Sequence, residues 1–146
     1  MIALLVAAAL MQPPPVTNAA KPMTHTMPGA PVTIDKGNQS NIDAGRMATV
    51  RTEAEWTRLW QEHNPDRPRP AVDFSKQMVV GVFMGSRNTA GFAVEIVSAT
   101  DADGVVTVHY RETMPTRGGI TAQVITSPYH LVSVPKTAST VKFQKE

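Results

Sequence analysis

A run of apolar residues in the middle of the chain sets the strongest limit on the fold. Residues 78–84 read Met-Val-Val-Gly-Val-Phe-Met, with no charged or strongly polar side chain. A near-continuous apolar run of this length is typical of a strand that is buried on both faces. The chain must therefore place packed structure on both sides of this strand.

Other short segments with the composition of strands follow, separated by turn signals. Residues 92–97 and 105–110 are rich in Val and are joined by Asp-Ala-Asp-Gly at 101–104, a tight-turn signal. Further candidates lie at 121–126, 129–134 and 140–143. Short strands at this spacing, with one early helix, predict an α+β fold that is mainly β. We expect an antiparallel-rich sheet or small sandwich with the helix packed on it.

The early helix is predicted by its first turn and by its apolar spacing. Thr52 and Glu55 form a capping box, in which the Thr52 hydroxyl accepts from the N–H of Glu55 and the Glu55 carboxylate reaches back to the N–H of Thr52. Trp56, Trp60 and His63 then recur at helical spacing. We expect this face to anchor the helix to a sheet.

The N-terminal segment has the character of a secretory signal peptide. Its apolar run is about ten residues long, far short of the roughly twenty that span a bilayer, and Ala19 or Ala20 offers a small-residue cleavage site. No Lys or Arg precedes the run, so an apolar start without an export role is the alternative. We predict a signal peptide at 1–20, a flexible linker at 21–45 and one folded domain at 46–146. Within the linker only Val32-Thr33-Ile34 suggests a strand, a short edge strand near its end. The mature chain would be extracytoplasmic, periplasmic or secreted, without a transmembrane span.

Composition argues against several classes of function. The 14 Lys and Arg residues nearly balance 12 Asp and Glu and are scattered, whereas nucleic-acid binding needs a dense basic stripe. Cysteine is absent, which excludes disulfides, thiol catalysis and cysteine-ligated metals. There is no G-x-S-x-G motif, and the four histidines do not stand at metal-ligand spacing. We therefore predict no catalytic residues, no metal and no cofactor.

A glycine-bounded loop is the best candidate for a binding site. Gly85 and Gly91 enclose a polar segment between two predicted strands, which we expect to be a tight hairpin over 85–92. Short polar loops on rigid strands often carry contacts, and a second glycine loop at 117–119 would add to the surface if it lay at the same end. The alternative is an ordinary hairpin whose glycines satisfy backbone geometry. The residues predicted to contact a partner are Arg87, Asn88, Thr89, Phe92, Arg117 and Tyr129.

Five short motifs, in this order, resemble the PrcB C-terminal domain family. They are Glu55-Trp56-x-x-Leu59-Trp60-x-x-His63, Val72-Asp73-Phe74, the run at 78–85, Gly91-Phe92-x-Val94-x-Ile96 and Ser127-Pro128-Tyr129-His130. The resemblance extends from about Thr49 to Phe143 and departs at Ala90-Gly91-Phe92, where the family more often has Gly-Gly-Tyr. It implies an extracytoplasmic domain without enzymatic activity. The member that names the family is a subunit that associates with a surface protease and stabilises it.

These observations together predict an exported, non-enzymatic protein-binding module. Its expected partner is another protein and not a nucleic acid. The candidate partner is an extracytoplasmic protease, which the module would accompany or stabilise. One alternative is a direct protease inhibitor that inserts the 85–92 hairpin into an active-site cleft. Another is a small pocket enzyme that uses His109, His130 and Glu112, which requires these three side chains to converge.

Overall fold

Strand β4 (Gln77–Phe83) is an inner strand of a four-stranded sheet in the computed structural model, which describes residues 25–26 and 30–146. The sheet has the order β2-β7-β4-β3 and is antiparallel throughout. Every residue of β4 from Met78 to Phe83 is buried. The expectation of a strand buried on both faces is confirmed. The other strands of this sheet are β2 (Val32–Gly37), β7 (Tyr129–Pro135) and β3 (Arg46–Val50).

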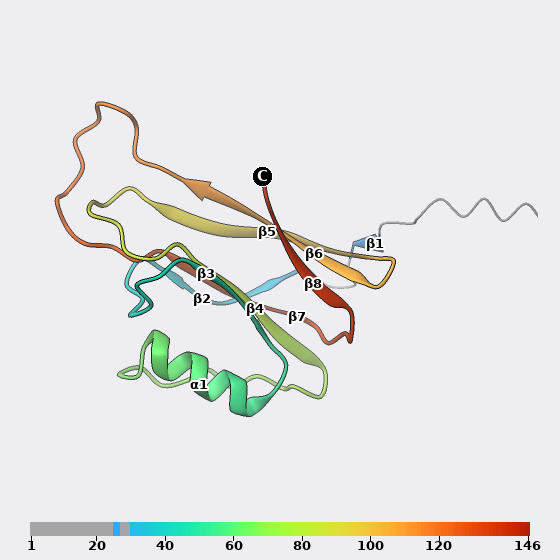
Figure 1. The fold of residues 1–146 in the computed structure, drawn as a ribbon. Helices are drawn as coiled ribbons and strands as arrows, with labels where there is room; N and C mark the ends of the chain where they lie inside the picture. The colour runs from blue at the N-terminus through green and yellow to red at the C-terminus, as the bar shows by residue number, and fades with distance from the viewer. Residues whose placement is uncertain (1–24, 27–29) are drawn as a thin grey trace, which may run out of the picture.

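A second sheet, with the order β1-β5-β6-β8, faces the first one (Figure 1). Its strands pair antiparallel except for β6 and β8, which are parallel. They are β1 (His25–Thr26), β5 (Ala93–Ala102), β6 (Val105–Thr113) and β8 (Thr140–Lys145). Helix α1 (Glu53–His63) covers the outer face of the β2-β7-β4-β3 sheet (Figure 1). The predicted class, α+β and mainly β with one early helix packed on a sheet, is confirmed.

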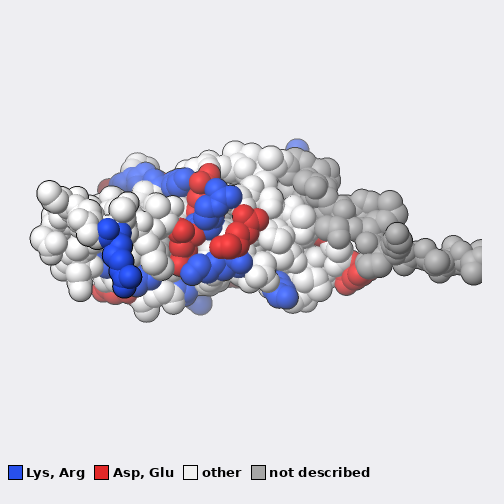
Figure 2. Space-filling view, turned by 90° about the horizontal axis from the view of Figure 1, so that it is seen from above, with Lys and Arg blue, Asp and Glu red and all other residues white. Residues whose placement is uncertain are grey.

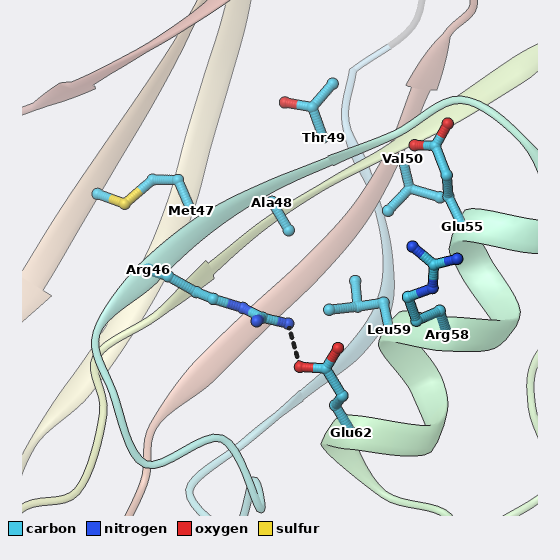
Figure 3. A pocket seen from close by; sticks show the side chains of 9 residues that line it. All are labelled: Arg46, Met47, Ala48, Thr49, Val50, Glu55, Arg58, Leu59 and Glu62. Carbon is cyan, nitrogen blue, oxygen red and sulfur yellow. Dashed lines mark ion pairs between the residues drawn. The ribbon is translucent and has the colours of Figure 1, made fainter.

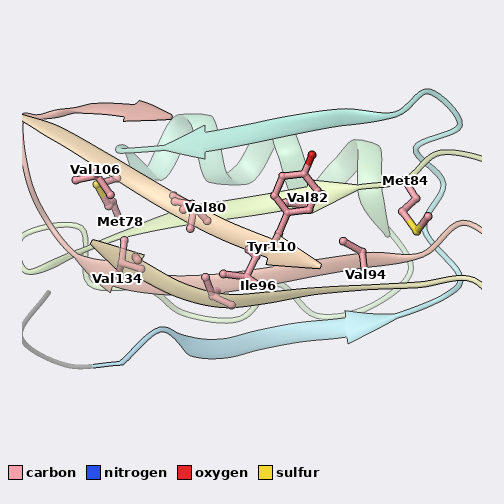
Figure 4. Close-up of a cluster of buried hydrophobic side chains, with 12 residues drawn as sticks. Met78, Val80, Val82, Met84, Val94, Ile96, Val106, Tyr110 and Val134 are labelled. Carbon is pink, nitrogen blue, oxygen red and sulfur yellow. The ribbon is translucent and has the colours of Figure 1, made fainter. Parts of the chain in front are cut away.

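Two apolar clusters result from the period-two alternation of β4. Met78, Val80 and Val82 point between the two sheets, together with side chains of β5, β6 and β7 such as Ile96, shown in Figure 4. Val79 and Phe83 point to the opposite face and pack under α1. The central strand thus contributes to both layers, which is why its sequence lacks the polar alternation of a half-exposed strand.

Helix α1 begins with the expected cap and buries the expected face. The Thr52 hydroxyl accepts from the N–H of Glu55 at 3.2 Å, but the Glu55 carboxylate accepts from the N–H of Arg51 at 3.5 Å instead of that of Thr52. Both indole N–H groups donate to carbonyls of the following loop, Trp56 to Pro70 at 2.8 Å and Trp60 to Arg67 at 2.9 Å. The tryptophans therefore fix the loop as well as the helix. Among the described residues, no helix is long and apolar enough to cross a membrane.

In the second half of the segment predicted as a linker, the structure has a strand. Strand β2 pairs with β7 and buries Asp35, so the folded part begins well before the expected boundary at residue 46. The suggestion of a short edge strand at Val32-Thr33-Ile34 is confirmed, but its length was not predicted, because Val32 and Thr33 are exposed and a polar residue takes the buried position. The predicted signal peptide at 1–20, and the linker up to residue 29 apart from His25–Thr26 in β1, lie outside the described residues.

Two loop predictions are wrong. The residues at 85–92 do not form a hairpin, because β4 and β5 belong to different sheets and the segment crosses from one sheet to the other. The segment at 121–126 is not a strand of either sheet, and makes one isolated bridge, between Thr126 and Arg87.

Candidate functional site

The crossing loop at 85–92 lies beside the long loop at 114–126, and we call the pair the loop tip. Arg87 and Thr126 exchange two backbone hydrogen bonds of 2.7 and 2.9 Å, and the N–H of Ala90 donates to the carbonyl of Ala122 at 3.0 Å. The Thr126 hydroxyl donates to the carbonyl of Thr89 at 2.9 Å. The two glycine loops therefore do lie at the same end of the molecule, at the left in Figure 1.

The glycines of the crossing loop serve its packing. Gly85 has φ +77°, and a Cβ there would lie 2.7 Å from backbone atoms of Asp43 and Gly45. Gly91 has φ +96°, and its Cβ would lie 3.0 Å from the ring of Pro115 in the neighbouring loop. Both positions combine a left-handed backbone with close contact, which only glycine tolerates at low cost.

The predicted contact residues of the loop tip differ in their exposure. Asn88 and Arg117 are exposed. Arg87, Thr89 and Phe92 are half-buried: the Arg87 guanidinium lies 5.4 Å from the centre of the Phe92 ring, and Phe92 packs on the core between the sheets. These three side chains thus stabilise the base of the loop tip, while Asn88 and Arg117 reach solvent.

Tyr129 does not belong to an exposed surface. Only 3 % of it is exposed, and it packs against Phe83 and His63 beneath α1. Since it lies on β7, the central partner of β4, its side chain has no access to a partner protein. The prediction of Tyr129 as a contact residue is therefore corrected.

The loop tip exposes four large apolar side chains that were not selected from the sequence. Ile120 is fully exposed and Ile125 is 72 % exposed, and Met114 and Val124 are also exposed. In Figure 2 the end of the molecule where these loops lie is mostly uncharged apart from a prominent basic side chain and acidic atoms at its rim, whereas charges of both signs are more densely interspersed over the middle of the same face. Residues 121–126 were expected to pair as a strand, which concealed the exposure of Val124 and Ile125.

The side chains of the expected pocket enzyme do not converge. His130 is buried, and its Nδ1 accepts the N–H of Ile96 at 2.8 Å while its Nε2 bonds the Thr33 hydroxyl at 2.9 Å. His109 lies 4.0 Å from Glu146 at the surface, and Glu112 pairs with Lys145 at 2.9 Å. The three therefore bind three separate sets of neighbours, and the pocket required for that alternative is not formed.

A buried polar cluster joins β2, α1 and β7. The Ser40 hydroxyl lies 2.8 Å from Nδ1 of His63, Nε2 of His63 lies 3.1 Å from the Asp35 carboxylate, and the Arg67 guanidinium reaches both carboxylate oxygens at 3.2 to 3.4 Å. Burial lowers the pKa of His63, against the raising influence of Asp35, so the ring is neutral at pH 7. A neutral ring then donates from Nε2 to Asp35 and accepts from Ser40 at Nδ1.

The electrostatics of this cluster favour an ionised Asp35. Burial alone would raise the pKa of this carboxyl, but hydrogen bonds from His63, Tyr129 and Arg67 hold it below its usual 3.8. Burial, together with the hydrogen bond to Asp35 and the charge of that carboxylate, raises the pKa of Tyr129 to about 12. The Tyr129 hydroxyl therefore stays protonated and serves as a donor.

The order Ser40, His63, Asp35 is that of a hydrolase triad, but the cluster is enclosed. His63 has no exposed surface, Ser40 is buried, and the Ser40 oxygen already accepts the N–H of Ile42 at 3.1 Å. No substrate reaches this hydroxyl in the structure. The cluster connects the helix to the sheet, and sequence reasoning missed it because its members are 28 and 23 residues apart along the chain.

The fold and its loops define a class: a small two-sheet β domain with one helix on its outer face and an apolar loop tip at one end. Residues 78–135 match the family model described as PrcB C-terminal, so the predicted family is confirmed, and this stretch belongs to it. The match runs from Met78 in β4 to the end of β7 and contains both loops of the tip. No match was found among curated proteins or among solved structures.

Proposed function

We propose that the protein is an exported, non-enzymatic protein-binding domain that acts as an accessory subunit of an extracytoplasmic protease complex. Membership of the PrcB C-terminal family supports a role beside a protease. The apolar run at the N-terminus supports export. The contact surface in this proposal is the loop tip.

The exposed apolar side chains of the loop tip are the observation that carries the proposal. Ile120 and Ile125 lie on a loop that is held by four hydrogen bonds to the crossing loop, three between backbone groups and one from a Thr hydroxyl. Clustered apolar exposure on a folded domain is characteristic of interaction sites. Because the base of the loop is fixed, binding costs less conformational entropy than it would for a free loop. Asn88 and Arg117 would add polar contacts at its rim.

A matched pair of variants tests the loop tip. The variant Ile120→Ser with Ile125→Ser removes the apolar contacts, and Val32→Ser makes the same kind of change on β2, where the side chain is also exposed. We expect wild type and Val32→Ser to recover the same protease from extracts of the native envelope, and the loop-tip variant to lose it. Equal recovery by all three proteins would contradict the assignment of the loop tip.

A protease assay then separates an accessory subunit from an inhibitor. With purified domain added to the recovered protease, the proposal expects the half-life of proteolytic activity to lengthen while the initial rate is unchanged. A fall in the initial rate would instead support direct inhibition.

Intact-mass measurement of the extracellular or periplasmic protein tests export, and a mature chain that begins close to residue 20 is the expected result.

A further inference from the structure

Most basic residues of the chain lie where a protease cannot hydrolyse the bond that follows them. Some are part of the helix or a strand, whose backbone is held by regular hydrogen bonds. Arg46 on β3 and Arg58 on α1 are examples: both line the groove shown in Figure 3, and Arg46 pairs there with Glu62 at 2.9 Å. The basic residues in these elements are Lys36, Arg46, Arg58, Arg111, Lys142 and Lys145.

The basic residues outside these elements are also protected, with one exception. Lys21, Arg67 and Arg69 each precede a proline, whose ring replaces the N–H and hinders cleavage of the bond before it. The others are held by hydrogen bonds to distant parts of the chain. These are Lys76, Arg87 and Lys136, through backbone bonds of 2.7 to 2.9 Å, and Arg51, through its guanidinium.

Arg117 is the exception. It is exposed and makes no hydrogen bond or ion pair with any residue that the structure describes. It lies on the longer loop of the loop tip, which projects beyond both sheets in Figure 1. Residues 116–120 are all exposed, which gives an approaching enzyme access to both sides of the Arg117–Gly118 bond.

The turn around Arg117 is held only weakly. The N–H of Gly119 donates to the carbonyl of Thr116 at 2.9 Å, the one backbone bond within 116–120 of the described chain, and Gly118 has φ +79°. A Cβ at Gly118 would have no atom within 4 Å, so no other segment packs on this turn. Proteolytic nicking concentrates at exposed loop tips of small and polar residues. Opening this turn into the extended form that a protease binds breaks a single hydrogen bond.

The chemistry of the loop selects one class of protease. Trypsin-like enzymes hold the side chain before the cleaved bond in a pocket with an aspartate at its base, which suits an arginine. The loop at 114–126 contains no Asp or Glu that would compete for this arginine or repel the pocket. Gly118 and Gly119, on the other side of the bond, present no side chain to obstruct the enzyme.

The topology keeps a cut chain together. A cut after Arg117 separates β7 and β8 from the preceding elements. However, β7 lies between β2 and β4 in its sheet, and all its residues from Tyr129 to Val134 are buried. In the other sheet β8 pairs with β6. The two fragments are therefore interleaved in both sheets and share both apolar clusters.

We propose that the Arg117–Gly118 bond is a processing site for a trypsin-like protease, and that the cut protein remains one folded unit of two chains. Hydrolysis adds one water across the amide, which leaves a carboxylate on Arg117 and an amine on Gly118. Processing here changes the loop tip and leaves the sheets intact. The proposal concerns cleavage and does not depend on the binding role of the loop tip.

Limited digestion of the full chain with trypsin tests the site. We expect the first cut after Arg117, and we expect both fragments to elute together at the position of the intact chain in size-exclusion chromatography. Arg117→Gln should abolish this cut. Lys136→Gln, at an exposed residue of another loop, should keep it. A first cut at another residue, or fragments that separate without denaturant, would overturn the proposal.

The extracytoplasmic fraction of the native cells tests whether such a protease meets the protein. The full chain is incubated with this fraction, with and without benzamidine, a planar cation that occupies the arginine pocket of trypsin-like enzymes. Mass spectrometry should find a fragment that ends at Arg117, and benzamidine should suppress it. An intact Arg117–Gly118 bond, or a cut that benzamidine does not affect, would contradict the assignment to this class of protease.

Discussion

Asp35 connects β2 to α1 and to the loop that follows the helix. Its carboxylate accepts hydrogen bonds from His63 on the helix and from Arg67 in the following loop. Asp35 itself is buried. The partners differ in burial, because His63 is enclosed and the Arg67 side chain is 52 % exposed. Their contributions to stability should therefore differ as well.

We predict that Asp35→Ala lowers the free energy of unfolding by about 3 kcal/mol, since it leaves the buried His63 N–H without an acceptor. Arg67→Ala should cost only about 1 kcal/mol, because an exposed guanidinium returns to water. Urea unfolding at pH 7, followed by tryptophan fluorescence, measures both. Equal losses in the two variants would show that the carboxylate is stabilised mainly by Arg67.

At the scale of elements, the crossing loop determines how the two sheets are connected. Gly85, two residues after the end of β4, makes a left-handed turn against Asp43 and Gly45. Ser86 then donates its N–H to the carbonyl of Asp43 at 2.8 Å. The turn directs the chain out of one sheet and toward β5 in the other. Its geometry is a requirement of the fold rather than of a binding site.

Two glycines with similar φ angles test this requirement. Gly85→Ala should cost about 3 kcal/mol, from the left-handed backbone and the clash with backbone atoms 2.7 Å away. Gly104→Ala, at φ +74° with no atom near its Cβ, should cost only about 1 kcal/mol. Thermal unfolding of both variants provides the comparison. A similar loss in each would mean that the φ angle alone, and not the close approach, requires glycine at 85.

The elements that the sequence predicted well are those set by local pattern. The apolar run of β4 and the tryptophan face of α1 depend on residues a few positions apart, so their burial could be inferred. The choice of strand partners could not, because β4 pairs with β7 and β3 and not with β5, which follows it. For the same reason the 85–92 segment was expected to be a hairpin, β2 was assigned to a linker, and the exposure of Ile125 was not foreseen.

At the scale of the whole molecule, His130 joins the two sheets. It lies on β7, and its Nδ1 accepts the N–H of Ile96 on β5, next to the register shift between Ile96 and Ser98. Because Ile96 supplies the proton of that bond, the His130 ring is neutral, with its own proton on Nε2 toward Thr33. Burial and the charge of Lys36 lower the pKa of His130 to about 4, against the raising influence of Glu95.

This arrangement makes stability fall as the pH is lowered from 6.5 to 4. Within that window the unfolded chain protonates His130 and the folded chain does not, so acid favours unfolding, and below about pH 4 the effect is complete. We predict that the free energy of unfolding of wild type drops by about 2 kcal/mol more between pH 7.5 and pH 5 than that of His130→Gln. His63, whose pKa is also lowered, contributes the same slope to both proteins. Urea unfolding at the two pH values measures both proteins. An unchanged pH dependence in His130→Gln would place the proton-linked step elsewhere, with His63 as the other histidine known to be buried in the described part of the chain.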